Sequence, residues 1–153
     1  PPLLLMYLGR LATFAFWVAC VGYAIRILPF HQWTLSWISL LPASLFLHAS
    51  LTADSTTNGL AFLLIAQILN ISFAGTSFTR KRAALILSLS LLITINKVVY
   101  APLILLLFFL TKDQFGSFRK KVFSLGAIFL AHAIVLFIWY QYAGDLFIPA
   151  DDY

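Results

Sequence analysis

The chain has 153 residues, of which 62% are hydrophobic and only 10% are charged, and its mean hydropathy is +0.97. This composition excludes a water-soluble globular domain, which needs more polar surface than these side chains supply. The net charge of +5 does not indicate a nucleic-acid partner, because no aromatic side chains alternate with the basic residues to stack on bases. Long apolar stretches without the alternation typical of a β-barrel predict an all-α, polytopic transmembrane helix bundle.

The first predicted membrane segments are separated by short polar breaks. Three full-length segments are expected before the main basic loop: Leu11–Leu28, which ends before Pro29, then Trp33–Ser50, and then Asn58–Ala74. The loop 75–82 carries three adjacent cations, so the positive-inside rule places it in the cytoplasm. Counting back from this loop puts His31 inside and puts both segment 51–57 and the amino-terminal end near Arg10 outside.

Two apolar runs flank Lys97, and each is too short to cross a bilayer. Ala83–Ile95 and Val98–Leu110 hold about 13 residues each, which rise roughly 20 Å as α-helix against about 30 Å of hydrocarbon. Pro102 favours a break between them, because proline is tolerated in the first turn of a helix and not in its middle. The sequence therefore predicts a short two-helix hairpin with Lys97 at its tip.

The basic clusters support a reversal of the chain at this point. One straight helix over 83–110 would place the clusters 80–82 and 119–121 on opposite sides of the membrane, whereas a hairpin keeps both inside. The last segment, about Val122–Tyr140, then returns outward. We expect about six membrane segments in a single transmembrane domain over residues 1–153, which starts without methionine and reads as an internal piece of a longer membrane protein. Four of the five acidic residues are expected outside: Asp54, Asp145, Asp151 and Asp152.

The polar residues expected near the outer face are the candidate site. Lys97 is the strongest candidate, since a charge at that depth is costly without a partner or a water-filled cavity. Arg10 is a second cation or a snorkelling anchor, and Asp54 belongs to the same site or caps the third helix. Tyr100 offers a phenol or is an ordinary interfacial aromatic. Two cations there indicate a phosphate partner, from a lipid head group or a lipid-linked sugar carrier, while no residue cluster has metal-ligand spacing and no cofactor is expected.

Four short strings carry a resemblance to known proteins. They are Tyr7-Leu8-Gly9-Arg10-Leu11, Leu41-Pro42, Ser50-Leu51-Thr52-Ala53-Asp54 and Asn96-Lys97-Val98-Val99-Tyr100-Ala101-Pro102-Leu103. With these strings the chain resembles a family of bacterial multi-pass membrane proteins of unassigned function. More distantly, it is similar to the GT-C superfamily of polyprenyl-phosphate-dependent glycosyltransferases. The order and membrane sidedness of the strings carry this resemblance over nearly the whole chain.

The GT-C resemblance implies an activity and a location. Such an enzyme, in the bacterial cytoplasmic membrane, transfers a sugar from a polyprenyl-phosphate carrier to a cell-envelope acceptor on the outer face. Arg10 would help bind the carrier phosphate, Lys97 would line the same cavity, and Asp54 would shape the surface near the donor. The catalytic carboxylate of the superfamily lies in the first external loop, which this chain is expected to lack, so we expect the chain alone to be inactive.

Two other functions remain open from the residues. A non-enzymatic lipid-binding protein, such as a flippase or a scaffold for envelope polysaccharide assembly, would use the same basic site for head groups. A transporter fragment would instead use Lys97 as a substrate or coupling charge.

Overall fold

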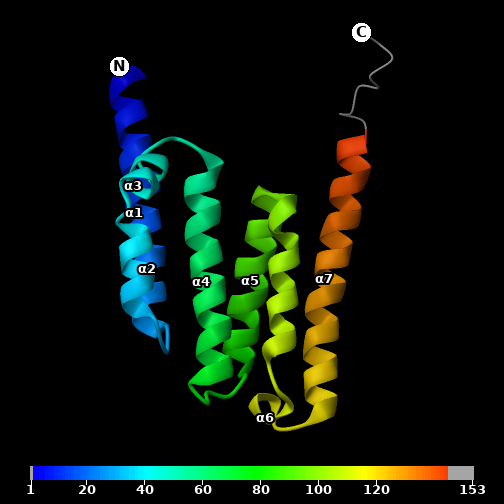
Figure 1. The fold of residues 1–153 in the computed structure, drawn as a ribbon. Helices are drawn as coiled ribbons and strands as arrows, with labels where there is room; N and C mark the ends of the chain where they lie inside the picture. Colours follow the sequence, from blue (N-terminus) through cyan, green and yellow to red (C-terminus); the bar gives the residue numbers. More distant parts are fainter. Residues whose placement is uncertain (1, 145–153) are drawn as a thin grey trace.

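A computed structural model describes residues 2–144, and all regular structure in that range is helical (Figure 1). The predicted all-α class is therefore confirmed for this part of the chain. Three helices are long and apolar enough to cross a membrane: α1 (Pro2–Ile27), α4 (Ala53–Phe73) and α7 (Phe118–Gly144). The expected count of about six membrane segments is not confirmed. The remaining elements are shorter: α2 (Gln32–Ser39), α3 (Pro42–His48), α5 (Arg80–Asn96), the 3₁₀ helix η1 (Val98–Phe109) and α6 (Lys112–Phe115).

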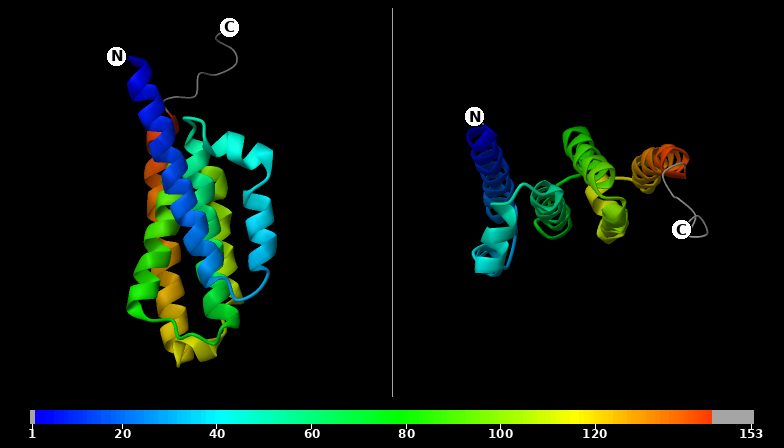
Figure 2. Two further views of the ribbon diagram at one scale, coloured as in Figure 1. Left: turned by 90° about the vertical axis from the view of Figure 1, so that its left-hand side faces the viewer. Right: turned by 90° about the horizontal axis from the view of Figure 1, so that it is seen from above.

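Seen along the helix axes, α1 with α2 beside it, α4, the α5–η1 pair and α7 follow one another across the bundle (Figure 2). Helix α4 contacts α1 on one side and α5 on the other, while α7 contacts α5 and η1. The largest buried cluster joins α4, α5, η1 and α7, with Leu64, Ile93 and Leu107 almost fully enclosed. Many other large apolar side chains on these helices are exposed, as expected for surfaces that face lipid.

The chain reverses at Lys97, as predicted. Helix α5 ends at Asn96, Lys97 is extended with φ −150° and ψ 106°, and η1 returns beside α5 (Figure 1). The 17 residues of α5 rise about 25 Å at 1.5 Å each, and the 12 residues of η1 rise about 24 Å at 2.0 Å each. The 3₁₀ form thus lets the shorter arm match the longer one. Both arms stop short of a bilayer's hydrocarbon thickness of about 30 Å.

The predicted single segment Trp33–Ser50 is wrong, because this stretch forms two short helices. Helix α3 begins at Pro42, and Leu41 before it is non-helical with φ −58° and ψ 137°. Proline has no backbone N–H to donate to a carbonyl of the preceding helical turn, and it disfavours helical geometry in the residue before it. With 8 and 7 residues, α2 and α3 are each too short to cross a membrane.

Three predicted helix starts were placed too late in the chain. Helix α1 begins at Pro2 instead of Leu11, so Arg10 lies well inside a helix instead of at its start. Helix α4 begins at Ala53 instead of Asn58, with Asp54 in its first turn. Helix α5 begins at Arg80, so the cluster 80–82 is helical and not a loop; the Thr79 side chain caps it by accepting from the Arg82 backbone nitrogen at 3.4 Å. The first turns of α4 and α5 are polar, and hydropathy misses them. The first turns of α1 are apolar, and its start was missed because Arg10 was placed at the membrane surface.

The two ends of the bundle differ in charge. One end, here named the tip end, carries Lys97, the start of α4 and the first residue of α1 (Figure 1). The opposite end, here named the basic end, carries eight of the ten Lys and Arg residues: Arg26, Arg80, Lys81, Arg82, Lys112, Arg119, Lys120 and Lys121. The chain therefore reaches the tip end and the basic end in turn, in the predicted order. The acidic residues Asp145, Asp151 and Asp152 lie outside the described residues.

Candidate functional site

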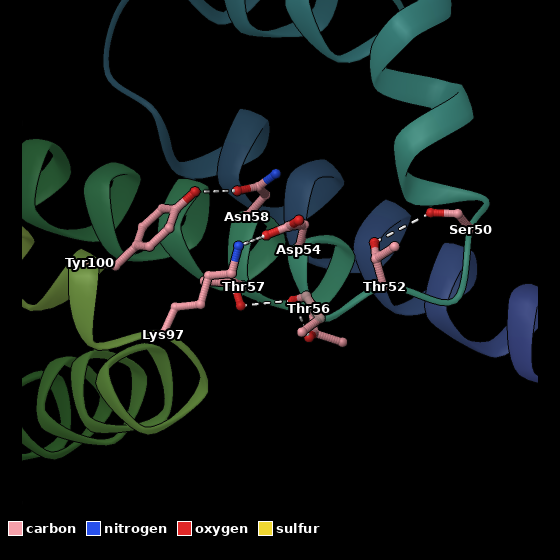
Figure 3. Close-up of polar contacts among 9 residues, drawn as sticks. Ser50, Thr52, Asp54, Thr56, Thr57, Asn58, Lys97 and Tyr100 are labelled. Atoms are coloured by element: carbon pink, nitrogen blue, oxygen red, sulfur yellow. Dashed lines mark hydrogen bonds and ion pairs between the residues drawn. The ribbon is translucent and has the colours of Figure 1, made fainter. Parts of the chain in front are cut away.

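An ion pair joins the hairpin tip to the start of α4. The Lys97 Nζ donates to Asp54 Oδ1, 43 positions earlier in the chain (Figure 3). Asp54 lies in the first turn of α4, where the helix dipole favours an anion, and Lys97 follows the last residue of α5, where the dipole favours a cation. The two antiparallel helix ends thus place each charge where it is stabilised twice, by the partner side chain and by its own helix.

A hydrogen bond beside the ion pair makes a second connection between the same elements. The Tyr100 hydroxyl of η1 donates to Asn58 Oδ1 of α4 at 3.0 Å (Figure 3). Asn58 lies one helical turn after Asp54, and Tyr100 lies shortly after Lys97, so the two contacts run in parallel. Sequence reasoning did not select Asn58. Asn58 could have been selected from its spacing, because it lies four residues after Asp54 and its side chain is therefore on the same face of the helix.

The pair keeps Lys97 charged and still accessible. The hydrogen bond that Lys97 donates to Asp54, helped by the charge of the carboxylate, raises the pKa of Lys97 above the ordinary value of 10.5. The side chains of Lys97 and Asp54 remain 40% and 35% exposed. An ammonium has three N–H donors, and Asp54 accepts from it, so donors remain for a second acceptor such as a phosphate oxygen.

A cavity lies between the hairpin tip and α7. Its volume is about 470 Å³, and its wall includes Asn96, Lys97, Tyr100 and Trp139. The wall is otherwise aliphatic, so Lys97 is the one basic residue that lines a mainly apolar hollow reaching α7. This combination suits a ligand that has an anionic group attached to an apolar body.

Three of the four predicted site residues come together, and Arg10 does not join them. Asp54, Lys97 and Tyr100 meet at the tip, whereas the Arg10 guanidinium is exposed and lies 6.0 Å from the centre of the Tyr7 ring on α1. Within residues 2–144 no hydrogen bond or ion pair connects Arg10 to the other three. Arg10 is nonetheless at the same end of the bundle, because a side chain added at its neighbour Gly9 would meet Leu51, just before α4.

A buried stack supports the start of α4 from the other side. The rings of Trp17 in α1 and His48 in α3 stack with centres 4.3 Å apart, and both side chains are buried. The Ser55 hydroxyl donates to the His48 carbonyl at 3.1 Å. The first turn of α4 is therefore held in place by α1 and α3 as well as by the hairpin. No group of three or more His, Cys, Asp or Glu side chains in the described range could hold a metal ion.

Comparison with known proteins identifies a family but does not name an activity. The model of a family described as "Predicted membrane protein (DUF2142)" matches residues 2–148. No curated protein and no solved structure matches the chain. The description supports a membrane location, in agreement with the long apolar helices, and names neither an enzyme nor a ligand.

Proposed function

The chain belongs to the DUF2142 family of predicted membrane proteins, and we propose that it is the lipid-phosphate-binding part of a GT-C-like glycosyltransferase. In this proposal the protein lies in the bacterial cytoplasmic membrane with its tip end outward. The tip end binds a polyprenyl-phosphate-linked sugar, which is transferred to a cell-envelope acceptor. The observation that carries the proposal is Lys97, which lines a mainly apolar cavity while its ammonium is paired with Asp54.

The cavity supplies contacts for both halves of a carrier lipid. The remaining Lys97 donors hydrogen-bond a phosphate oxygen, an interaction that is strong because both partners are charged. Trp139 and the aliphatic wall contact the isoprenoid chain. Asp54 acts as the counter-ion of Lys97 when no ligand is bound and keeps the ammonium protonated. Arg10, elsewhere on the same end, contributes positive potential toward the anionic head group instead of a direct contact in the cluster.

One observation favours a non-enzymatic alternative for the described residues. Residues 2–144 contain two acidic side chains, Asp54 and Asp113. Asp54 is paired with Lys97, and Asp113 belongs to α6 at the basic end. Neither is a free carboxylate at the tip that could deprotonate an acceptor hydroxyl. Sugar transfer therefore needs a base from outside this range, whereas a lipid-binding scaffold or flippase needs none.

Binding of the carrier lipid tests the shared part of both functions. The full-length protein is placed in nanodiscs of zwitterionic lipid, and its equilibrium affinities for a polyprenyl monophosphate and for the uncharged polyprenol are measured. Lys97→Ala should weaken binding of the phosphate about tenfold or more, because a charge-assisted hydrogen bond is lost, and should leave polyprenol binding unchanged. Lys97→Arg should retain most of the affinity. Lys81→Ala, an exposed cation at the basic end, is the matched control, and equal affinity of Lys97→Ala and wild type contradicts the proposal.

Transfer of a labelled sugar separates the enzyme from the alternative. Membranes that contain the full-length protein are given a polyprenyl-phosphate-linked radiolabelled sugar, and label in the envelope polymer fraction is counted. An enzyme gives protein-dependent incorporation that Lys97→Ala reduces. Carrier binding without any incorporation assigns the protein to the lipid-binding scaffold or flippase class.

A further inference from the structure

The basic end contains a second cavity, of about 580 Å³, between the first turns of α5 and α7. Three cations line it: Arg80 from α5, and Arg119 and Lys120 from α7. These residues come from two clusters that are almost 40 positions apart in the chain and that the hairpin returns to the same end (Figure 1). The positive-inside rule explains cations at this end of the bundle. It does not require that they surround one hollow.

The three cations of this cavity have no acidic partner among the described residues, where the single salt bridge is the Lys97–Asp54 pair. Their sequence neighbours behave differently. Arg82 donates to the Ser77 carbonyl at 2.8 Å, and Lys121 donates to the Leu110 carbonyl at 2.5 Å. Those two side chains stabilise the ends of loops and helices. The three that line the cavity therefore form an uncompensated positive site, which is complementary to a compact anion.

The remainder of the cavity wall includes three phenylalanine side chains. Phe78 and Phe115 lie with ring centres 4.4 Å apart, and Phe123, about one turn further into α7, is 80% exposed. An exposed phenylalanine at this depth in a membrane helix contacts acyl chains. A free phosphate ion would use the cations and leave the aromatic wall without a role. A phospholipid uses both, with its phosphate among the cations and its chains along Phe123.

We propose that this cavity binds the phosphate head group of an anionic glycerophospholipid from the leaflet at the basic end. The site is separate from the carrier-lipid site at the tip, and its ligand differs in being a bulk membrane lipid. Basic hollows between membrane helices are suited to such head groups, and a Lys or Arg near the membrane surface contributes roughly fivefold in affinity for anionic lipid. Three cations together predict a preference for anionic over zwitterionic lipid on the order of 100-fold.

Native mass spectrometry of the detergent-solubilised full-length protein measures this preference. The protein is titrated with phosphatidylglycerol and separately with phosphatidylcholine, and the first bound lipid is quantified. The double variant Arg80→Gln/Arg119→Gln should lose about 30-fold of the preference, since two cations are removed. Arg80→Lys/Arg119→Lys, which keeps both charges, should retain it and shows that loss is not due to misfolding. Lys81→Gln, next to Arg80 but outside the cavity wall, should leave it unchanged.

Three results would overturn the proposal. The first is equal binding of the two phospholipids by the wild-type protein. The second is an equal effect of Lys81→Gln and of Arg80→Gln/Arg119→Gln, which would mean that net charge alone matters. The third is full displacement of phosphatidylglycerol by millimolar inorganic phosphate, with no contribution from Phe123→Ala, which would assign the cavity to a free anion. If inorganic phosphate does not displace phosphatidylglycerol and Phe123→Ala binds the lipid more weakly, the results support a phospholipid as the ligand.

Discussion

Lys97 and Asp54 form an ion pair across 43 positions of the chain, and this pair fixes the hairpin tip to the first turn of α4. The contact depends on the reversal of the chain at Lys97, between two hairpin arms that are each about 25 Å long and so shorter than the hydrocarbon of a bilayer. A charge that would be costly in a straight helix is thereby placed at a helix end, beside an anion and a cavity.

Cysteines at the two paired positions should cross-link. In a Cys20→Ala background, Asp54→Cys/Lys97→Cys should react efficiently with a short bifunctional thiol reagent, because the native side chains are in direct contact. Asp54→Cys/Val99→Cys is the matched control, since Val99 is 85% exposed and two residues further along the turn. Protease cleavage between α4 and α5 followed by gel electrophoresis reads the link. Equal yields for the two pairs contradict the observed orientation of Lys97.

The ion pair should make stability depend on pH at the alkaline end. Asp54 raises the pKa of Lys97 above its ordinary 10.5, so the contribution of the pair is fully present below that value and is lost as the pH rises through the raised pKa. The free energy of unfolding is measured from about pH 8 to about pH 12 for Tyr100→Phe and for Tyr100→Phe/Lys97→Met, which removes the tyrosine titration from both. The first variant should lose more stability above pH 10.5 than the second. Parallel curves contradict the assignment.

The hydrogen bond between Tyr100 and Asn58 should give a measurable coupling energy. A double-mutant cycle with Tyr100→Phe, Asn58→Ala and the combined variant isolates the 3.0 Å contact. The expected coupling is about 0.6 kcal/mol, the average for side-chain hydrogen bonds between membrane helices. Unfolding in mixed micelles of increasing sodium dodecyl sulfate supplies the free energies. Additive effects of the two single substitutions would show that the bond is not formed.

Gly59 should be essential for the close packing of α4 on α1. A β-carbon added there would lie 3.3 Å from Cys20 Cβ and 3.5 Å from the Trp17 ring. Gly59→Leu is therefore expected to lower the free energy of unfolding by about 1–3 kcal/mol through overpacking. Gly126→Leu in α7 is the control, because no heavy atom lies within 4 Å of its added β-carbon and the site is exposed. Gly126→Leu should be neutral or slightly stabilising, because leucine has a higher helix propensity than glycine. A similar loss of stability in both variants would contradict overpacking at Gly59.

The reversal at Lys97 was predictable because several independent signals coincide there. The two apolar runs are short, Pro102 disfavours a continuous helix, and both basic clusters need the same side of the membrane. The ion pair itself could not be derived. Asp54 had a local explanation as a helix cap, and only the packing of α5 on α4 brings it to Lys97.

The break between α2 and α3 was missed for the opposite reason. Trp33–Ser50 is long and apolar, so hydropathy alone predicts one membrane segment, although Pro42 at its centre carries the signal for a break. The 3₁₀ geometry of η1 also has no clear sequence signature, since its apolar residues fit an α-helix equally well. Arg10 was placed at the outer start of the first segment, and it lies instead inside α1, which begins at Pro2. Among residues 2–144 it makes no hydrogen bond or ion pair with Asp54 or Lys97.

Accessibility of three engineered cysteines tests the reversal most directly, because the tip site exists only if α5 and η1 run in opposite directions. Val99→Cys, Lys81→Cys and Lys120→Cys are made one at a time in a Cys20→Ala background, and intact cells are treated with a membrane-impermeant thiol reagent. The cysteine at position 99 should be labelled from outside, and the cysteines at 81 and 120 should be labelled only after permeabilisation. If the cysteines at 81 and 120 are labelled from opposite sides, the segment between them crosses the membrane as one rod, which contradicts the tip site and the lipid-phosphate binding proposed for it.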